Sequence, residues 1–193
     1  MWVSPDLLTA AGLTGALAVF AGYAASVVDH GWLWLAITGY VVNWFGDSMD
    51  GSLARYRQIE RPSFGYFVDH SCDGLAVLLI LAGLGLSPFV RLDVALLALA
   101  GYLLLSIHAF LSARVLNELK LSYVAAGPTE LRLVLIAFTL TMLVAGTGPS
   151  VMSSFSTYDI ATVIAGMALI TLFIVQTIFT ARRIAAKEHA GEM

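Results

Sequence analysis

The chain has 193 residues, of which 59% are hydrophobic and only 12% are charged, and its formal net charge is −3. A soluble domain carries about 25% charged residues, so this composition, with a mean hydropathy of +0.86, excludes an ordinary soluble protein. We therefore expect an integral membrane protein that has no nucleic-acid partner.

Apolar runs follow one another along the chain, and most approach the ~20 residues that a helix needs to cross a bilayer. The second run is short. We expect it to continue as a helix into the polar segment 47–57, whose carboxylates would then face a protein-lined cavity. The sequence predicts an all-α bundle of six transmembrane helices, a single domain over residues 1–193, with apolar runs at 7–28, 32–46, 74–90, 94–113, 131–148 and 159–181.

The positive charges are distributed unevenly between the predicted loops. With six spans both chain ends lie on one side, together with nine of the ten Lys and Arg residues, and only Arg91 falls on the other side. Because short cytoplasmic loops carry the excess of Lys and Arg, this side should be the cytoplasm, in a bacterial or archaeal plasma membrane. The nine residues are Arg55, Arg57, Arg61, Arg114, Lys120, Arg132, Arg182, Arg183 and Lys187.

Four aspartates lie close together in this otherwise apolar chain. Residues three or four apart share a face of a helix, so Asp47 and Asp50 occupy neighbouring rows on one helix. Asp69 and Asp73 form a row on the next helix. Carboxylates at membrane depth are costly unless they have partners, so we expect this cluster to carry the function.

Residues with small side chains lie one turn from the aspartates. Gly51 follows Asp47, Ala54 shares a row with Asp50, and Gly65 precedes Asp69 by one turn. Such positions let a bulky ligand approach the backbone.

The chemistry of the cluster favours divalent cations. Carboxylates without a set of His and Cys ligands are hard oxygen donors that suit Mg²⁺, Mn²⁺ or Ca²⁺. Four aspartates suffice for two ions, and such a pair can clamp a diphosphate while a bond between phosphates breaks. Arg55, one turn beyond Gly51, can bind a phosphate oxygen that the metals leave uncovered.

Two other interpretations of the aspartates stay open. They could form surface ion pairs with nearby arginines in a cytoplasmic loop, although Asp69 and Asp73 lead directly into an apolar span. They could instead line the pathway of a divalent-cation transporter, although that function gives no reason for the neighbouring glycines or for Arg55.

The spacing of these residues is similar to a known signature. Written as D-x2-D-G-x2-A-R, nine residues and G-x3-D-x3-D, residues 47–73 resemble the CDP-alcohol phosphotransferase family of membrane enzymes that make phospholipids. The start S-P-D-L-L-T-A-A-G also resembles the family's P-N-x-L-T opening, with Asp6 in place of asparagine. The gap between Arg55 and Gly65 is one residue longer than the family pattern, at a connection between helices where insertions are tolerated.

The resemblance implies a fold and a metal site. The fold would be a six-helix bundle, commonly a homodimer, with a polar cavity facing the cytoplasm and two divalent cations, Mg²⁺ or Mn²⁺. Asp47, Asp50, Asp69 and Asp73 would be the metal ligands. Asp73 would also be the candidate general base that removes the proton of the acceptor hydroxyl.

The resemblance also implies the substrates. Gly51, Ala54 and Gly65 would border the cytidine nucleotide, and Arg55 would contact its phosphates. The hydroxyl of an acceptor would attack the phosphate that bears the alcohol, and CMP would be released. An inactive relative that serves as a partner subunit is the remaining alternative.

Two short segments bear on the choice of donor. Residues 67–73 (F-V-D-H-S-C-D) and 127–130 (G-P-T-E) resemble the choline and ethanolamine phosphotransferases, which use a CDP-aminoalcohol. The six-span size is more similar to bacterial and archaeal enzymes that transfer a phosphatidyl group from CDP-diacylglycerol to a polar alcohol or sugar phosphate.

Four further residues lie near the predicted site. Arg114 and Arg132 fall where helix ends should ring the mouth of the cavity, so either could bind an acceptor phosphate or a lipid headgroup. We expect His70 to point to another face than Asp69 as a hydrogen-bonded packing residue, and Cys72 to be a small buried packing residue.

Overall fold

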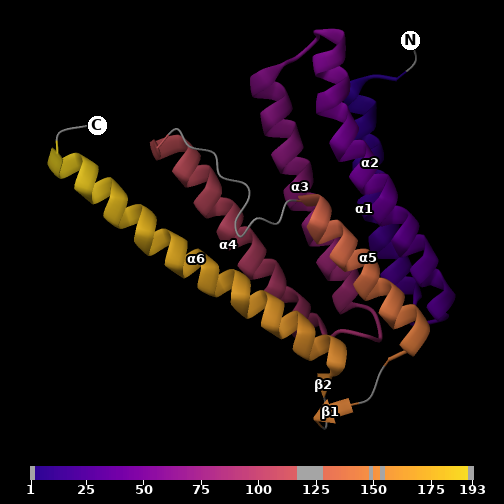
Figure 1. Ribbon diagram of the computed structural model, residues 1–193. Coiled ribbons are helices and arrows are strands. Elements are labelled where there is room, and N and C mark those ends of the chain that lie inside the picture. The colour runs from indigo at the N-terminus through magenta and orange to yellow at the C-terminus, as the bar shows by residue number, and fades with distance from the viewer. Residues whose placement is uncertain (1–2, 117–127, 148–149, 153–154, 191–193) are drawn as a thin grey trace.

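The computed structural model describes residues 3–116, 128–147, 150–152 and 155–190, and Lys120 and Gly127 lie outside them. Within these ranges the chain forms six α-helices, a short 3-10 helix and an antiparallel pair of strands (Figure 1). The elements are α1 (Pro5–Ala25), η1 (His30–Trp32), α2 (Leu33–Arg57), α3 (Pro62–Gly85), α4 (Leu92–Leu116), α5 (Pro128–Ala145), β1 (Ser150–Met152), β2 (Phe155–Ser156) and α6 (Thr157–Ala190).

The predicted all-α fold class is confirmed. Among the described residues, four helices are long and apolar enough to cross a membrane, namely α1, α3, α4 and nearly all of α6. Because α2 and α5 are not among these four, the six spans and the cytoplasmic orientation of the cavity stay predictions. The sequence analysis did not predict the strands β1 and β2.

The polar segment 47–57 is helical, as expected, because α2 continues through it to Arg57. Gln58 caps the end of α2, and its φ of 55° lies in the left-handed region that terminates many helices. α3 begins at Pro62, a residue suited to the first turn because it has no N–H to leave unpaired. The connection between the two acidic helices is therefore short.

Glycines allow α1 and α2 to pack backbone against backbone. A Cβ atom on Gly15 would lie 2.4 Å from the backbone nitrogen of Asn43, and one on Gly46 would lie 2.5 Å from that of Gly12. The Asn43 side-chain amide donates to the carbonyl oxygen of Gly12 at 3.0 Å. Small residues are the usual means by which membrane helices approach this closely. The contact holds the start of α1 beside the polar half of α2.

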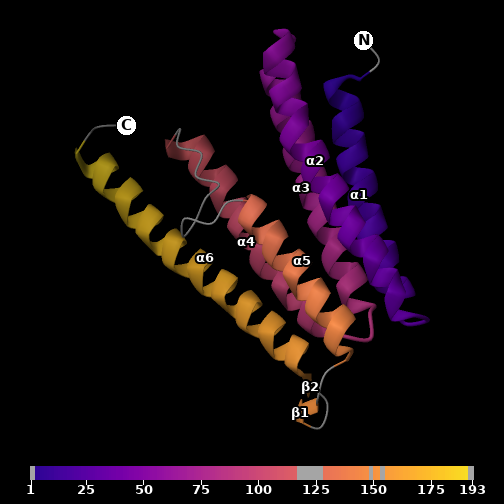
Figure 2. The same cartoon turned by 45° about the vertical axis from the view of Figure 1, so that its right-hand side comes forward.

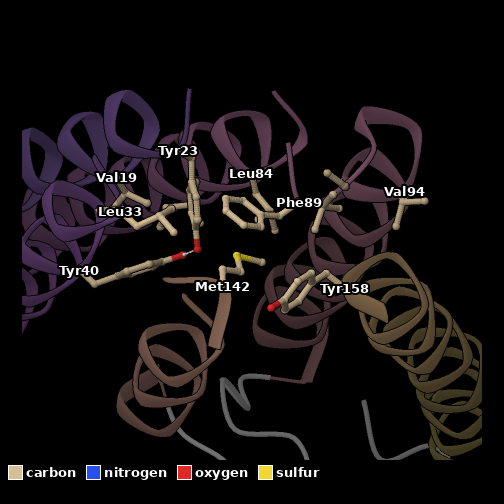
Figure 3. Packing of buried hydrophobic residues seen from close by; sticks show 13 residues of the cluster. Val19, Tyr23, Leu33, Tyr40, Leu84, Phe89, Val94, Met142 and Tyr158 are labelled. Carbon is tan, nitrogen blue, oxygen red and sulfur yellow. Dashed lines mark hydrogen bonds between the residues drawn. The ribbon is translucent and has the colours of Figure 1, made fainter. Parts of the chain in front are cut away.

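The helices form two groups that diverge toward one end of the molecule. Figures 1 and 2 show α4 and α6 side by side, separated from α1, α2 and α3 where α1 begins and α6 ends. The groups meet at the end that carries β1 and β2. Buried apolar side chains fill this junction (Figure 3), including Tyr23, Tyr40, Leu84, Phe89, Met142 and Tyr158.

Hydrogen bonds of tyrosine hydroxyls connect α5 to α1 and α6 in this core. The Tyr23 hydroxyl lies 2.7 Å from Thr139 Oγ1 and 3.2 Å from the Tyr40 hydroxyl. Because Thr139 donates its own proton to the carbonyl oxygen of Leu135, Tyr23 donates to Thr139 and Tyr40 donates to Tyr23. The Tyr158 hydroxyl contacts the carbonyl oxygens of Thr141 and Gly146, each at 3.1 Å. These buried polar groups are thus satisfied within the protein.

A buried aspartate closes the same end. Asp159, only 3% exposed, accepts from the backbone N–H groups of Arg91 and Ser156, each at 2.8 Å. This ties the α3–α4 connection to the start of α6. The hydrogen bonds that the Arg91 guanidinium donates to Asp93 raise the pKa of Arg91 above its ordinary value.

Candidate active site

The four predicted metal ligands lie around one small cavity. Asp47 and Asp50 come from α2, and Asp69 and Asp73 come from α3. The cavity has a volume of about 20 Å³, room for about one water molecule or small ion. Its remaining lining is Thr9, Gly12, Leu13, Asn43, Cys72 and Ala76. The regularly spaced aspartates of α2 and α3 therefore come together at one cavity.

Asp50 is held by groups from two helices. Thr9 Oγ1, on α1, lies 2.7 Å from Asp50 Oδ2, and the backbone N–H of Gly51 donates to Oδ1. Thr9 was not predicted as a site residue, because its role depends on the contact between α1 and α2. The only signal was its place in the family-like opening at residues 4–12.

Asp47 forms an ion pair with a residue far away in the sequence. Arg132, in the second turn of α5, places Nη2 2.7 Å from Asp47 Oδ2. Both side chains are largely buried, with exposed fractions of 14% for Arg132 and 24% for Asp47. Arg132 was expected at the mouth of the cavity, and the structure places it on a predicted metal ligand.

His70 is closer to the carboxylates than expected. Its Nδ1 lies 3.5 Å from Asp69 Oδ2 and 3.9 Å from Asp73 Oδ2, so the prediction that it faces away from Asp69 was wrong. Its ring packs against Tyr66 and Phe110, with centroids 4.4 and 5.3 Å away, and these contacts turn Nδ1 toward the acidic row. Among the described residues, the buried Nε2 has no hydrogen-bond partner, so His70 packs on aromatic rings but is not a fully hydrogen-bonded histidine.

A larger cavity adjoins the carboxylates. It has a volume of about 550 Å³, within the 300–1,000 Å³ typical of ligand sites. Asp50 and Asp69 line both cavities, so the two share a border. The other residues that line the larger cavity are Ser4, Pro5, Asp6, Thr9, Gly51, Ala54, Arg55, Ile59, Glu60, Arg61, Pro62, Phe64, Gly65, Tyr66 and Val68.

The four predicted nucleotide-binding residues all line this larger cavity. A Cβ atom on Gly51 would lie 3.3 Å from the Arg55 guanidinium, so the missing side chain lets Arg55 fold back over the helix. Arg55 Nη2 also lies 3.3 Å from Ser52 Oγ. A Cβ atom placed on Gly65 would have no neighbour within 4 Å among the described residues, which leaves that part of the wall open.

The connection with the extra residue forms the rim of the larger cavity. Arg61 pairs with Asp6 and lies over the Phe64 ring at 4.1 Å from its centroid. The Arg57 guanidinium donates to the carbonyl oxygen of Val3. The start of α1 is thus attached to the α2–α3 connection, and Gly65 remains on the cavity wall.

The donor set suits hard divalent cations. Four carboxylates from two helices surround a space of the size of an ion, and Mg²⁺, Mn²⁺ and Ca²⁺ prefer such oxygen ligands. The ligand atoms of Asp69, His70 and Asp73 also lie within 4.8 Å of one another. Ions held there would border the larger cavity, because Asp50 and Asp69 belong to both.

Comparisons with known proteins support the family to which the spacing of the aspartates pointed. The model of the CDP-alcohol phosphatidyltransferase family matches residues 2–186. Archaetidylinositol phosphate synthase of Methanothermobacter thermautotrophicus is 35% identical over 101 residues, which are 52% of this chain and 49% of that relative. The match therefore spans about half the length of the curated relative. The resemblance predicted from residues 47–73 is confirmed: the chain belongs to the CDP-alcohol phosphatidyltransferase family.

Proposed function

We propose that this protein is a metal-dependent transferase of phospholipid synthesis that moves a phosphatidyl or phospho-alcohol group from a CDP-linked donor to a hydroxyl acceptor, releasing CMP. Family membership supports this reaction. The observation that carries the proposal is the border shared by the two cavities, because Asp50 and Asp69 line both the carboxylate cavity and the larger cavity. A diphosphate in the larger cavity would lie beside cations bound to the aspartates.

In this proposal Asp47, Asp50, Asp69 and Asp73 hold two divalent cations, Mg²⁺ or Mn²⁺. When bound, the cations supply charge neutralisation for a diphosphate. Thr9 keeps Asp50 turned toward the cavity through the 2.7 Å hydrogen bond. Mutation of such a partner of a metal ligand typically lowers metal affinity or activity by about 10- to 100-fold.

The larger cavity would hold the cytidine nucleotide. Gly51, Ala54 and Gly65 would border the nucleotide, since each offers little or no side chain at the wall. Arg55 would donate to a phosphate oxygen. A planar guanidinium suits this task because it can form two parallel hydrogen bonds to a phosphate.

Asp73 is our candidate for the general base. It would accept the proton of the acceptor hydroxyl while that oxygen forms a bond to the phosphorus bearing the lipid or alcohol. The bond between this phosphorus and the bridging oxygen then breaks, and the electron pair leaves with CMP. In this assignment His70, whose Nδ1 lies 3.9 Å from Asp73 Oδ2, would lie beside the candidate base.

The curated relative makes one substrate pair the first to test. Its name states that it synthesises archaetidylinositol phosphate. We therefore place a CDP-linked lipid first as donor and a phosphorylated polar alcohol, such as an inositol phosphate, first as acceptor. Because the match covers half of that relative, both substrates are proposals.

The test is CMP release by the purified protein in lipid, with Mg²⁺ or Mn²⁺. CDP-diacylglycerol, CDP-choline and CDP-ethanolamine are offered as donors with a panel of alcohols and alcohol phosphates, and Asp69→Asn is the blank. We expect release that needs a metal, one donor and one acceptor. Cation flux through the protein without nucleotide, and no CMP with any pair, would favour the transporter instead.

We further propose that six spans place the cavity at the cytoplasmic face and that the protein is a homodimer, as the family resemblance implies. The distribution of nine cations against Arg91 supports the orientation. Labelling of a cysteine introduced at Glu60 by a membrane-impermeant reagent, in spheroplasts and in inverted vesicles, tests it. Labelling only in inverted vesicles is the expected result.

A further inference from the structure

The ion pair between Arg132 and Asp47 links α5 to the predicted metal site. The pair joins Nη2 to Oδ2 at 2.7 Å, and both side chains are largely buried. A charge pair with this little exposure is screened much less by water and salt than a surface pair. Its formation therefore matters for the position of both helices.

The two ends of α5 are held differently. Its second half is fastened through Thr139 and Thr141, which contact the hydroxyls of Tyr23 and Tyr158. Toward its start, Arg132 reaches Asp47 on α2, and Figure 1 shows α5 running from this region down to the hairpin end. The first turns of α5 are therefore attached to α2 through an ion pair with a predicted metal ligand.

We propose that Arg132 competes with a divalent cation for the carboxylate of Asp47, so that metal binding weakens the ion pair and loosens the first turns of α5. This inference rests on the proposed metal site. A cation bound to Asp47 would lie close to the Arg132 guanidinium, and two positive charges in a partly buried site repel each other strongly. Competition for one carboxylate is reciprocal, since each cation weakens the binding of the other by the same factor.

Metal affinity is the first readout. Binding of Mn²⁺ to the full-length protein in lipid nanodiscs is measured by electron paramagnetic resonance for the wild type, Arg132→Gln, Arg132→Lys and Arg182→Gln. We expect Arg132→Gln to lower the Kd for Mn²⁺ by about tenfold, within the usual range of coupling between sites. Arg132→Lys keeps the charge and should stay near the wild type. Arg182→Gln removes an exposed cation of α6 and should change nothing.

Hydrogen exchange is the second readout, and it uses the wild-type protein. We expect Mn²⁺ to speed exchange of backbone amides in residues 130–136, whereas a metal that merely tightened the bundle would slow it. Asp47→Asn should abolish this response. The experiment does not depend on the folding of the Arg132 variants.

The outcomes separate the two proposals. Mn²⁺ binding with an unchanged or raised Kd in folded Arg132→Gln overturns the competition and leaves the metal site standing. Exchange in 130–136 that Mn²⁺ leaves unchanged or slows also overturns it. If the wild type binds no Mn²⁺, the metal site itself is wrong, and the competition is rejected with it.

Discussion

Polar groups lie at both ends of the bundle, but they are buried at one end and only partly buried at the other. At the end that carries β1 and β2, the hydroxyls of Tyr23, Tyr40 and Tyr158 and the carboxylate of Asp159 all have partners inside the protein. At the other end, four carboxylates from α2 and α3 face one small cavity. Like charges in such proximity disfavour one another unless cations lie between them. The first end therefore serves stability, and the second is arranged for a ligand.

The largest effect should come from removing a carboxylate. Asp50→Asn and Asp69→Asn should each lower CMP release by about a thousandfold or more, since several kcal/mol of metal-borne stabilisation is lost and each 1.4 kcal/mol is a factor of ten. The midpoint of thermal unfolding should stay the same or rise, because repulsion is relieved. Full activity in either variant would contradict the proposed metal site.

The second comparison is between two glycines. Gly15→Ala places a Cβ atom 2.4 Å from the backbone of Asn43 and should destabilise the protein by about 1–3 kcal/mol. Gly74→Ala is the matched control, because in the part of the chain that the structure describes no neighbour lies within 4 Å of its Cβ position. Unfolding by denaturant in mixed micelles measures both. Equal stability of the two variants would contradict the close packing of α1 and α2.

A smaller effect on activity is expected from Thr9. Thr9→Val keeps the shape of the side chain and removes the hydrogen bond to Asp50, so Mn²⁺ affinity and CMP release should fall roughly tenfold. Thr9→Ser keeps the hydroxyl and serves as the control. If valine and serine behave alike, the hydroxyl has no part in the site.

The smallest effect on activity is expected at the end that carries β1 and β2. Tyr23→Phe removes both the donor to Thr139 and the acceptor of the Tyr40 hydroxyl, and should lower the free energy of unfolding by about 1 kcal/mol or more. The rate of CMP release at a temperature well below unfolding should not change. A large loss of activity with intact stability would show that the two ends are coupled more tightly than their contacts indicate.

Local periodicity made the acidic helices predictable. The spacing within residues 47–57 and 65–73 indicated carboxylates on one face of each of two helices with small residues beside them, and this spacing pointed to the family that the comparison confirmed. The continuation of α2 through its polar half was predicted because the second apolar run, residues 32–46, is short for a membrane span. Within a helix, the faces that residues share follow from 3.6 residues per turn, without knowledge of other elements.

Contacts between elements were not predictable in this way. Thr9 reaches Asp50 across 41 positions of sequence, and Arg132 reaches Asp47 across a larger separation. His70 turns toward Asp69 because Tyr66 and Phe110 hold its ring. The buried Asp159 was not predicted because one of its partners, the backbone N–H of Arg91, lies in the separate α3–α4 connection. The pairing of β1 with β2 lies within the α5–α6 connection, where the apolar runs carry no information.

The sequence by itself determined the helical class, the two helices that carry the aspartates and the family. Only the tertiary structure decided which residues complete the site, because glycine contacts set the distance between α1 and α2. That distance brings Thr9 to Asp50, and the packing of α5 brings Arg132 to Asp47. Periodicity is local along a chain, whereas the approach of one helix to another depends on the shapes of both surfaces.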